Sequence, residues 1–136
     1  MAPELFVDTS AWFALADPED PAHDKAARAL RTAVQTGVRV VTTNLVVAET
    51  HAMLLRRVGA RTALAFVKTV GDPPNLVVHS TAALEAAAVQ DWLDRFDDQA
   101  FSLTDAVSFA IMAERSIKEA LALDKHFRVA GFVTVP

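Results

Sequence analysis

The alternation of short β-favouring runs with longer helical segments is the feature that most constrains how this chain folds. Five runs rich in Val, Leu and Phe have the length of strands: 4–7, 38–42, 75–79, 120–123 and 132–135. Segments with helix start and stop signals lie between them, over 21–37, 43–59, 60–74, 80–98 and 102–116. Strands that alternate with helices indicate a parallel sheet covered on both faces. We therefore expect one domain over residues 1–136, a three-layer α/β/α sandwich with a central parallel five-stranded sheet.

Composition narrows the class of protein. The chain is 52% hydrophobic and 22% charged, as in a compact α/β domain. It contains no cysteine, which excludes disulfides and thiolate metal sites. The first residues lack the pattern of a signal peptide, and no apolar run approaches the length of a membrane span. We expect a cytoplasmic protein with no membrane partner.

The net charge of −4 conceals a strong asymmetry along the chain. Residues 25–71 hold eight basic residues and one acid, a balance of +7, whereas the remainder holds five basic residues and sixteen acids. Such a division can place a basic surface beside an acidic one. A surface that binds phosphate is one interpretation, and ordinary solvation of the surface is the other.

Two aspartates directly follow strand runs. Asp8 comes after "LFV" and Asp124 after "ALAL". Ligands of open α/β sheets bind at the carboxyl ends of the strands, where the strand order reverses. If the first and fourth strands are neighbours across that point, both aspartates face one crevice. The alternative is that each aspartate only caps the helix that follows.

Glu49 and Asp105 are acids within helical segments. The helical neighbours of Glu49 at spacings of three and four are all apolar, so we expect its side chain on the apolar face, where an unpaired carboxylate is costly. Asp105 ends the sequence "SLTD", which matches a capping box with Ser102 as N-cap. A capping role and a metal-binding role are compatible for Asp105, because a helix amino terminus favours negative charge.

The four acids are separated by 41, 56 and 19 residues, so only the fold can bring them together. Carboxylates crowded at one sheet edge repel one another unless they share protons or bind a divalent cation. Oxygen ligands alone select Mg²⁺ or Mn²⁺, and Mg²⁺ commonly bridges to a substrate phosphate. The acids therefore predict metal-assisted phosphoryl chemistry with water as the nucleophile.

Four stretches together resemble the PIN-domain ribonucleases, in particular the VapC-type toxins of bacterial toxin–antitoxin pairs: "FVDTSAWFAL", "TNLVVAETHAML", "FSLTDAVSFAIM" and "ALALDKHFRVAGF". They occur in the family's order over residues 5–132. The resemblance implies a Mg²⁺-dependent endoribonuclease with Asp8, Glu49, Asp105 and Asp124 as catalytic and metal-binding acids. It also implies an antitoxin partner that binds an apolar groove near residues 44–70, and a homodimer in which helix 81–95 packs against a second copy.

Further residues receive supporting roles in this interpretation. Ser10 and Thr104 lie beside the acids and are expected to orient ligands or waters. Three arginines beyond Glu49 are the first candidates for contacts to RNA phosphates: Arg56, Arg57 and Arg61. Trp12 is more typical of a core side chain than of a base-stacking one. The four histidines form no metal-binding pair, and we assign none of them a catalytic role.

Three other functions are alternatives to this interpretation. A phosphatase of the haloacid class also uses a strand-end aspartate and Mg²⁺, but it requires a second acid at the position of Ser10. A response-regulator receiver needs paired early acids and a late lysine, which match poorly. A protein-interaction domain of the same fold, with acids that no longer act, predicts that Asp8→Asn leaves cellular effects and partner binding unchanged.

Overall fold

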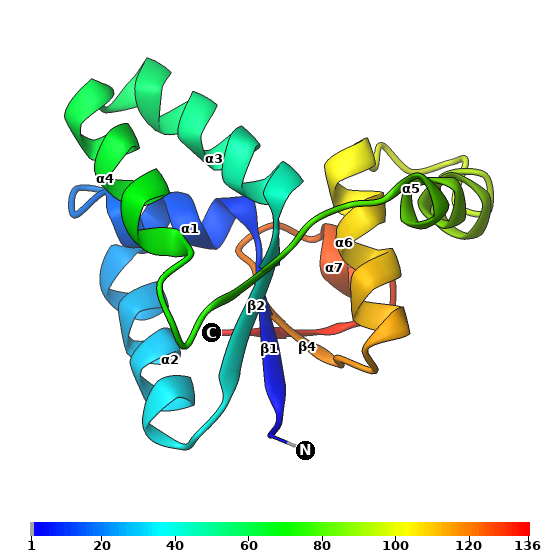
Figure 1. Ribbon diagram of the computed structural model, residues 1–136, viewed down its shortest axis with the longest axis horizontal. Helices are drawn as coiled ribbons and strands as arrows, with labels where there is room; N and C mark the ends of the chain where they lie inside the picture. Colours follow the sequence, from blue (N-terminus) through cyan, green and yellow to red (C-terminus); the bar gives the residue numbers. More distant parts are fainter. Residues whose placement is uncertain (1) are drawn as a thin grey trace.

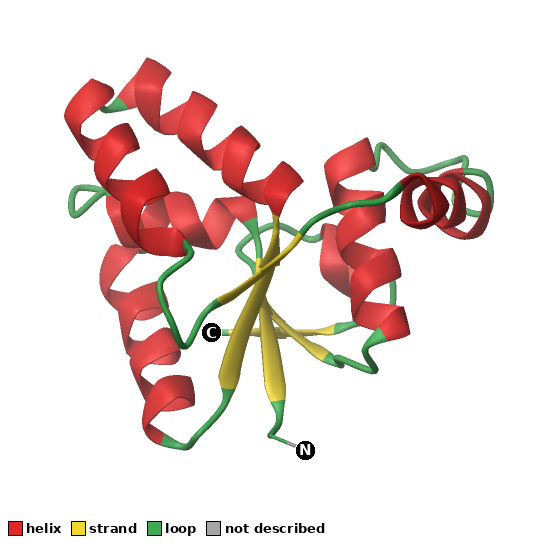
Figure 2. Ribbon diagram, viewed as in Figure 1, coloured by secondary structure: helices red, strands yellow, loops and turns green. Residues whose placement is uncertain are grey.

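The computed structural model describes residues 2–136 and has a five-stranded sheet between two groups of helices (Figures 1 and 2). The strands are β1 (Glu4–Val7), β2 (Arg39–Thr43), β3 (Leu76–Val78), β4 (Glu119–Leu121) and β5 (Val133–Val135). All four neighbouring pairs are parallel, in the order β3-β2-β1-β4-β5. The predicted α/β architecture with a parallel five-stranded sheet is confirmed.

The helices form two layers, one on each side of the sheet (Figure 1). One group contains α1 (Thr9–Ala16), α2 (His23–Gln35) and the hairpin of α3 (Asn44–Arg57) with α4 (Ala60–Val70). The other contains α5 (Ala82–Ala88), the π-helical turn η1 (Val89–Leu93), α6 (Leu103–Glu114) and α7 (His126–Val129). No helix within residues 2–136 combines the length and the apolar character needed to cross a membrane.

Helix α4 ends at Val70 with Gly71 as its C-cap, as the stop signals of Gly71 and the two prolines predict. The helical segments depart from the expectation in two other places. The helix expected over 80–98 becomes η1, in which the Asp94 N–H donates to the Val89 carbonyl five residues earlier. Helix α1 has no counterpart among the expected segments, because it is buried on most sides and shows little amphipathic period.

The sheet order reverses between β1 and β4. The chain passes from β1 to β2 and β3 on one side, and returns to β4 and β5 on the other. Val7 is in register with Leu121, so the residues that follow these two strands share one edge of the sheet. The condition set by the sequence, that the first and fourth strands be neighbours, is therefore met. This edge is the usual ligand-binding position in open α/β sheets.

Candidate active site

Asp8 is a buried carboxylate at the reversal point of the sheet. Its side chain is 2% exposed, and its backbone N–H donates to the carbonyl of Leu121 at 3.1 Å. Asp8 is the N-cap residue of α1, but its side chain makes no capping hydrogen bond. Burial, followed by the charges of Asp124 and Asp105, raises the pKa of Asp8 from its ordinary value of 3.8 to about 7. Simple helix capping therefore does not explain this acid.

Ser10 joins Asp8 to the loop that follows β4. Its Oγ donates to Asp8 Oδ2 at 3.2 Å and accepts the backbone N–H of Leu123 at 3.0 Å. The next residue, Asp124, is half-buried, and its Oδ1 accepts the backbone N–H of His126 at 3.0 Å. Ser10 thus holds the ends of the first and fourth strands together; its role in orienting ligands or waters stays a prediction.

Asp105 lies at the start of α6 and is 8% exposed. The predicted capping box is present: Ser102 Oγ accepts the Asp105 N–H at 3.0 Å, and Asp105 Oδ2 accepts the Ser102 N–H at 3.1 Å. His126 Nδ1 also lies 3.0 Å from Asp105 Oδ2, and its ring packs edge-on against Phe101. The sequence interpretation missed this partner. Its only local signal was the position of His126 two residues after Asp124.

Glu49 occupies a different environment from the one expected. The buried residues of α3 are Val46, Thr50 and Leu54, spaced four residues apart, and Glu49 lies beside this line, on the exposed part of the helix. The prediction of a carboxylate on the buried face was wrong, because three of the four apolar neighbours used to define that face, Leu45, Ala52 and Met53, are themselves only partly buried. Glu49 is not among the main causes of the raised pKa of Asp8.

The donor atoms at this edge suit a hard divalent cation. All are carboxylate oxygens. The negative charges of Asp124 and Asp105 raise the pKa of Asp8, which means that they disfavour its ionised form, and a bound cation would offset this repulsion. Thr9 Oγ1, next to Asp8 in the chain, is buried and lacks a hydrogen-bond partner among the described residues. Within residues 2–136, however, no group of three or more acids and histidines is already arranged to hold a metal. The chemistry fits a cation, and the arrangement requires side-chain movement to bind one.

The remaining predicted residues differ in their burial and in their position. Thr104 is half-buried, and none of the hydrogen bonds in the described part of the chain joins its side chain to the acids. The three arginines Arg56, Arg57 and Arg61 are exposed at the junction of α3 and α4. The Arg57 guanidinium lies 5.7 Å from the ring centroid of Phe13, on α1.

Trp12 belongs to the core, as predicted. Its ring is 7% exposed and packs against Phe66 at a centroid distance of 5.8 Å. Its Nε1 donates to Thr42 Oγ1 at 3.2 Å, which joins α1 to β2. A ring held in this way is not placed to stack on a nucleic-acid base.

One family model and one named protein match almost the whole sequence. The family model of the PIN domain matches residues 5–133. A protein named 23S rRNA-specific endonuclease VapC20, from Mycobacterium tuberculosis strains CDC 1551 and H37Rv, is 40% identical over 131 residues, which cover 96% of this chain and 97% of the relative.

Solved structures agree with the sequence relatives. The crystal structure of M. tuberculosis VapC20, described as a sarcin–ricin loop cleaving toxin, superposes with a TM-score of 0.89 and 40% identity, covering 97% of this chain and 99% of the other. Rickettsia felis VapBC2, bound to a DNA fragment from its promoter, gives a TM-score of 0.71 at 7% identity over 96% of each chain. The second likeness supports the fold alone. By its matched residues and its relatives, this chain belongs to the PIN-domain family.

Proposed function

We propose that this protein is a metal-dependent endoribonuclease and the toxin of a toxin–antitoxin pair. The observation that carries the proposal is the buried Asp8 at the reversal point of the sheet, whose pKa is raised by burial, Asp124 and Asp105. Hydrogen bonds from Ser10 and from the Thr9 and Ser10 backbone lower this pKa less than burial and the two acids raise it, so a bound cation would compensate the ionised carboxylate. The relative named as a 23S rRNA-specific endonuclease supports the same activity.

The roles of the acids follow from their surroundings. Mg²⁺, or Mn²⁺, held by oxygens of Asp8, Asp105, Asp124 and Glu49, would neutralise charge on the scissile phosphate and activate water. Ser10 keeps the Asp8 carboxylate beside the loop of Asp124. Ser102 and His126 hold Asp105 by hydrogen bonds to the same oxygen, Oδ2. Glu49, exposed on α3, is free to move towards a bound cation.

The substrate we propose is 23S rRNA, cleaved in a structured loop. The relative with 40% identity over almost the whole chain is named for that RNA, and its crystal structure is described as that of a sarcin–ricin loop cleaving toxin. The test is cleavage of an RNA hairpin with the sarcin–ricin loop sequence, compared with a hairpin of the same stem and a scrambled loop. Cleavage of both hairpins at equal rates would overturn the choice of substrate and leave the nuclease activity standing.

The activity itself is tested with Mg²⁺, with a chelator and with Asp8→Asn. We expect cleavage only in the first condition, and unchanged cleavage by Asp91→Asn, a matched variant at an exposed carboxylate on η1. Thermal unfolding provides a second readout: Mg²⁺ should raise the melting temperature of the unsubstituted protein more than that of Asp8→Asn. Cleavage that survives both the chelator and Asp8→Asn would rule out the proposed chemistry and favour the interaction-domain alternative.

The arginines at the α3–α4 junction are proposed to bind RNA phosphates. All eight basic residues of the +7 segment are exposed, and Arg57 packs on Phe13 of the helix that begins after Asp8. Replacing Arg56, Arg57 and Arg61 together by alanine should weaken RNA binding, and should lower the slope of log affinity against log salt by about 0.7 for each phosphate that is no longer neutralised. An unchanged slope would show that these arginines do not contact RNA phosphates. A double variant at two exposed basic residues outside the +7 segment and the candidate site serves as control: Arg95 and Lys118.

The antitoxin is proposed to bind the exposed apolar face of the α3–α4 hairpin. This face is formed by Leu55, Val58, Leu64 and Val67, which are between 40% and 53% exposed. Several exposed large apolar side chains on two neighbouring helices are typical of a protein-binding site. Leu64→Glu should abolish co-purification with the product of the adjacent gene, whereas Val133→Glu, on β5, should not. A homodimer through α5 remains a prediction, to be checked by light scattering of the purified chain.

A further inference from the structure

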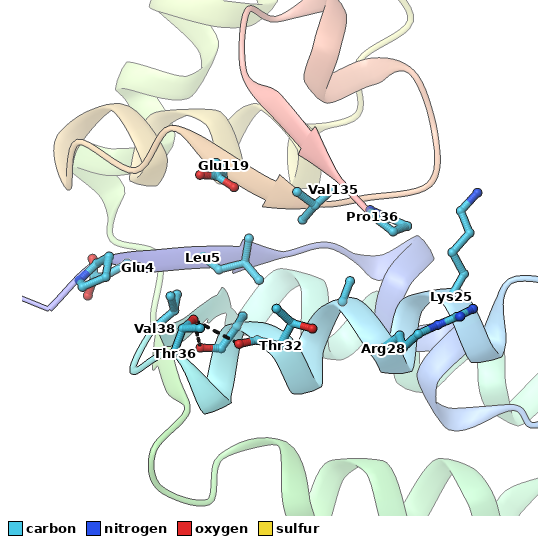
Figure 3. A pocket seen from close by; sticks show the side chains of 13 residues that line it. Glu4, Leu5, Lys25, Arg28, Thr32, Thr36, Val38, Glu119, Val135 and Pro136 are labelled. Atoms are coloured by element: carbon cyan, nitrogen blue, oxygen red, sulfur yellow. Dashed lines mark hydrogen bonds between the residues drawn. The ribbon is translucent and has the colours of Figure 1, made fainter.

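A cavity lies away from the candidate active site, between α2 and strands β1, β4 and β5 (Figure 3). Its volume is about 590 Å³, within the usual range of small-molecule sites. The walls are mainly apolar and are formed by β1, α2, the residue before β2 and β5: Leu5, Ala29, Ala33, Val38 and Val135. Binding of an apolar group in such a cavity is favourable, because it removes apolar surface from water.

The charges of the cavity are distributed unevenly. Lys25 and Arg28, on the first two turns of α2, lie at the end near Pro136, and Glu4 lies at the opposite end (Figure 3). The Glu4 carboxylate accepts hydrogen bonds from Arg115 at 2.8 and 3.0 Å, so its charge is compensated within the protein. Lys25 and Arg28 have no ion-pair partner among residues 2–136. One end of an apolar cavity therefore carries two uncompensated positive charges.

We propose that this cavity is a binding site for an amphipathic monoanion, a small molecule with an apolar body and one acidic group. The body would lie between α2 and the face of β1, β4 and β5, and the acidic group would lie between Lys25 and Arg28. Charge complementarity sets the orientation, because Glu119 lies among the residues at the end away from the two cations (Figure 3). This site is separate from the carboxylates at the reversal point, so it does not depend on the nuclease activity.

The test uses decanoate on the full chain, observed by amide chemical shifts in ¹⁵N–¹H NMR spectra. We expect saturable shifts at α2, β4 and β5. Decanol, which has the same apolar chain without the charge, should bind roughly three- to tenfold more weakly, the range expected for one or two partly exposed ion pairs. Acetate, which has the charge without the chain, should cause no saturable shift at the same concentrations.

Variants separate the charge from the cavity. The double variant Lys25→Gln with Arg28→Gln should weaken decanoate binding roughly three- to tenfold and leave decanol binding unchanged. Arg31→Gln is the matched control, because Arg31 is exposed on the same helix and does not line the cavity. Ala29→Leu should weaken the binding of both decanoate and decanol, because the larger side chain fills the cavity. The NMR spectrum checks that this variant folds.

Three results would overturn the proposal. Equal affinities for decanoate and decanol would show that the cations contribute nothing. Decanoate shifts confined to other parts of the chain would place its site elsewhere. A short RNA that shifts the amides of α2, with no response to decanoate, would assign Lys25 and Arg28 to the RNA surface instead.

Discussion

Replacement of Asp8 by asparagine is expected to stabilise the metal-free protein above neutral pH. The folded protein holds the Asp8 proton up to a pKa of about 7, against an ordinary value of 3.8. The folded state therefore binds more protons than the unfolded state between these values, and stability falls as the pH rises from about 4 to about 7. The difference of about 3 corresponds to about 4 kcal/mol at 25 °C. Relaxation of the protein and water penetration reduce the cost of ionising a buried carboxylate. We therefore expect Asp8→Asn to raise the free energy of unfolding by about 2–4 kcal/mol at pH 8.

The assay is urea unfolding followed by circular dichroism at pH 4, 6 and 8, with a chelator present throughout. The free energy of unfolding of Asp8→Asn should equal that of the unsubstituted protein at pH 4. It should be higher by part of the expected difference at pH 6 and by the whole difference at pH 8. In thermal unfolding the gain at pH 8 corresponds to roughly 6–15 °C for a chain of this size. Asp91→Asn, at an exposed position, should stay within about 0.5 kcal/mol of the unsubstituted protein at each pH.

Two outcomes would refute this reasoning. If Asp8→Asn and the unsubstituted protein differed by the same amount at pH 4 and pH 8, the Asp8 carboxylate would not titrate as its burial requires. If asparagine destabilised the protein above pH 7, the hydrogen bonds from Ser10 and from the Thr9 and Ser10 backbone would stabilise the ionised carboxylate more than burial and the neighbouring acids destabilise it. Either result would remove the electrostatic argument for a cation at this edge of the sheet.

Three further substitutions test other parts of the structure. Hydrogen bonds from Arg115 are the main cause of the lowered pKa of Glu4, so Glu4→Gln should lower the free energy of unfolding in urea by about 1–3 kcal/mol at pH 7. This cost should disappear as the pH falls below 4.5, the ordinary pKa of the group, and a cost that is the same at every pH would contradict the prediction. Trp12→Phe should cost about 1–2 kcal/mol because it removes the hydrogen bond to Thr42, with RNA affinity unchanged in a filter-binding assay, and weaker RNA binding at full stability would disagree. Ser102→Ala should cost about 1 kcal/mol in thermal unfolding by removal of the N-cap of α6, and a cost near zero would show that the cap contributes nothing.

Periodic patterns located most of the secondary structure but not all of it. The five strands lie within two residues of the predicted runs, because short apolar β-favouring stretches are a local signal. The capping box at Ser102 was also visible locally, since both partners lie within one helical turn. Helix α1 was not visible, because a helix buried on most sides has no polar face to set a period.

The sequence by itself determined the alternation of strands and helices and the positions of the four acids within that order. Only the tertiary structure decided which of these acids interact. The pairing of β1 with β4 brings Asp124 close enough to raise the pKa of Asp8, and the return of the chain after β4 places His126 against Asp105. The same packing leaves Glu49 exposed, although its neighbours in the sequence are apolar. The physical reason is that burial and electrostatic coupling depend on contacts between residues far apart in the chain, whereas a sequence pattern reports only the nearest turns.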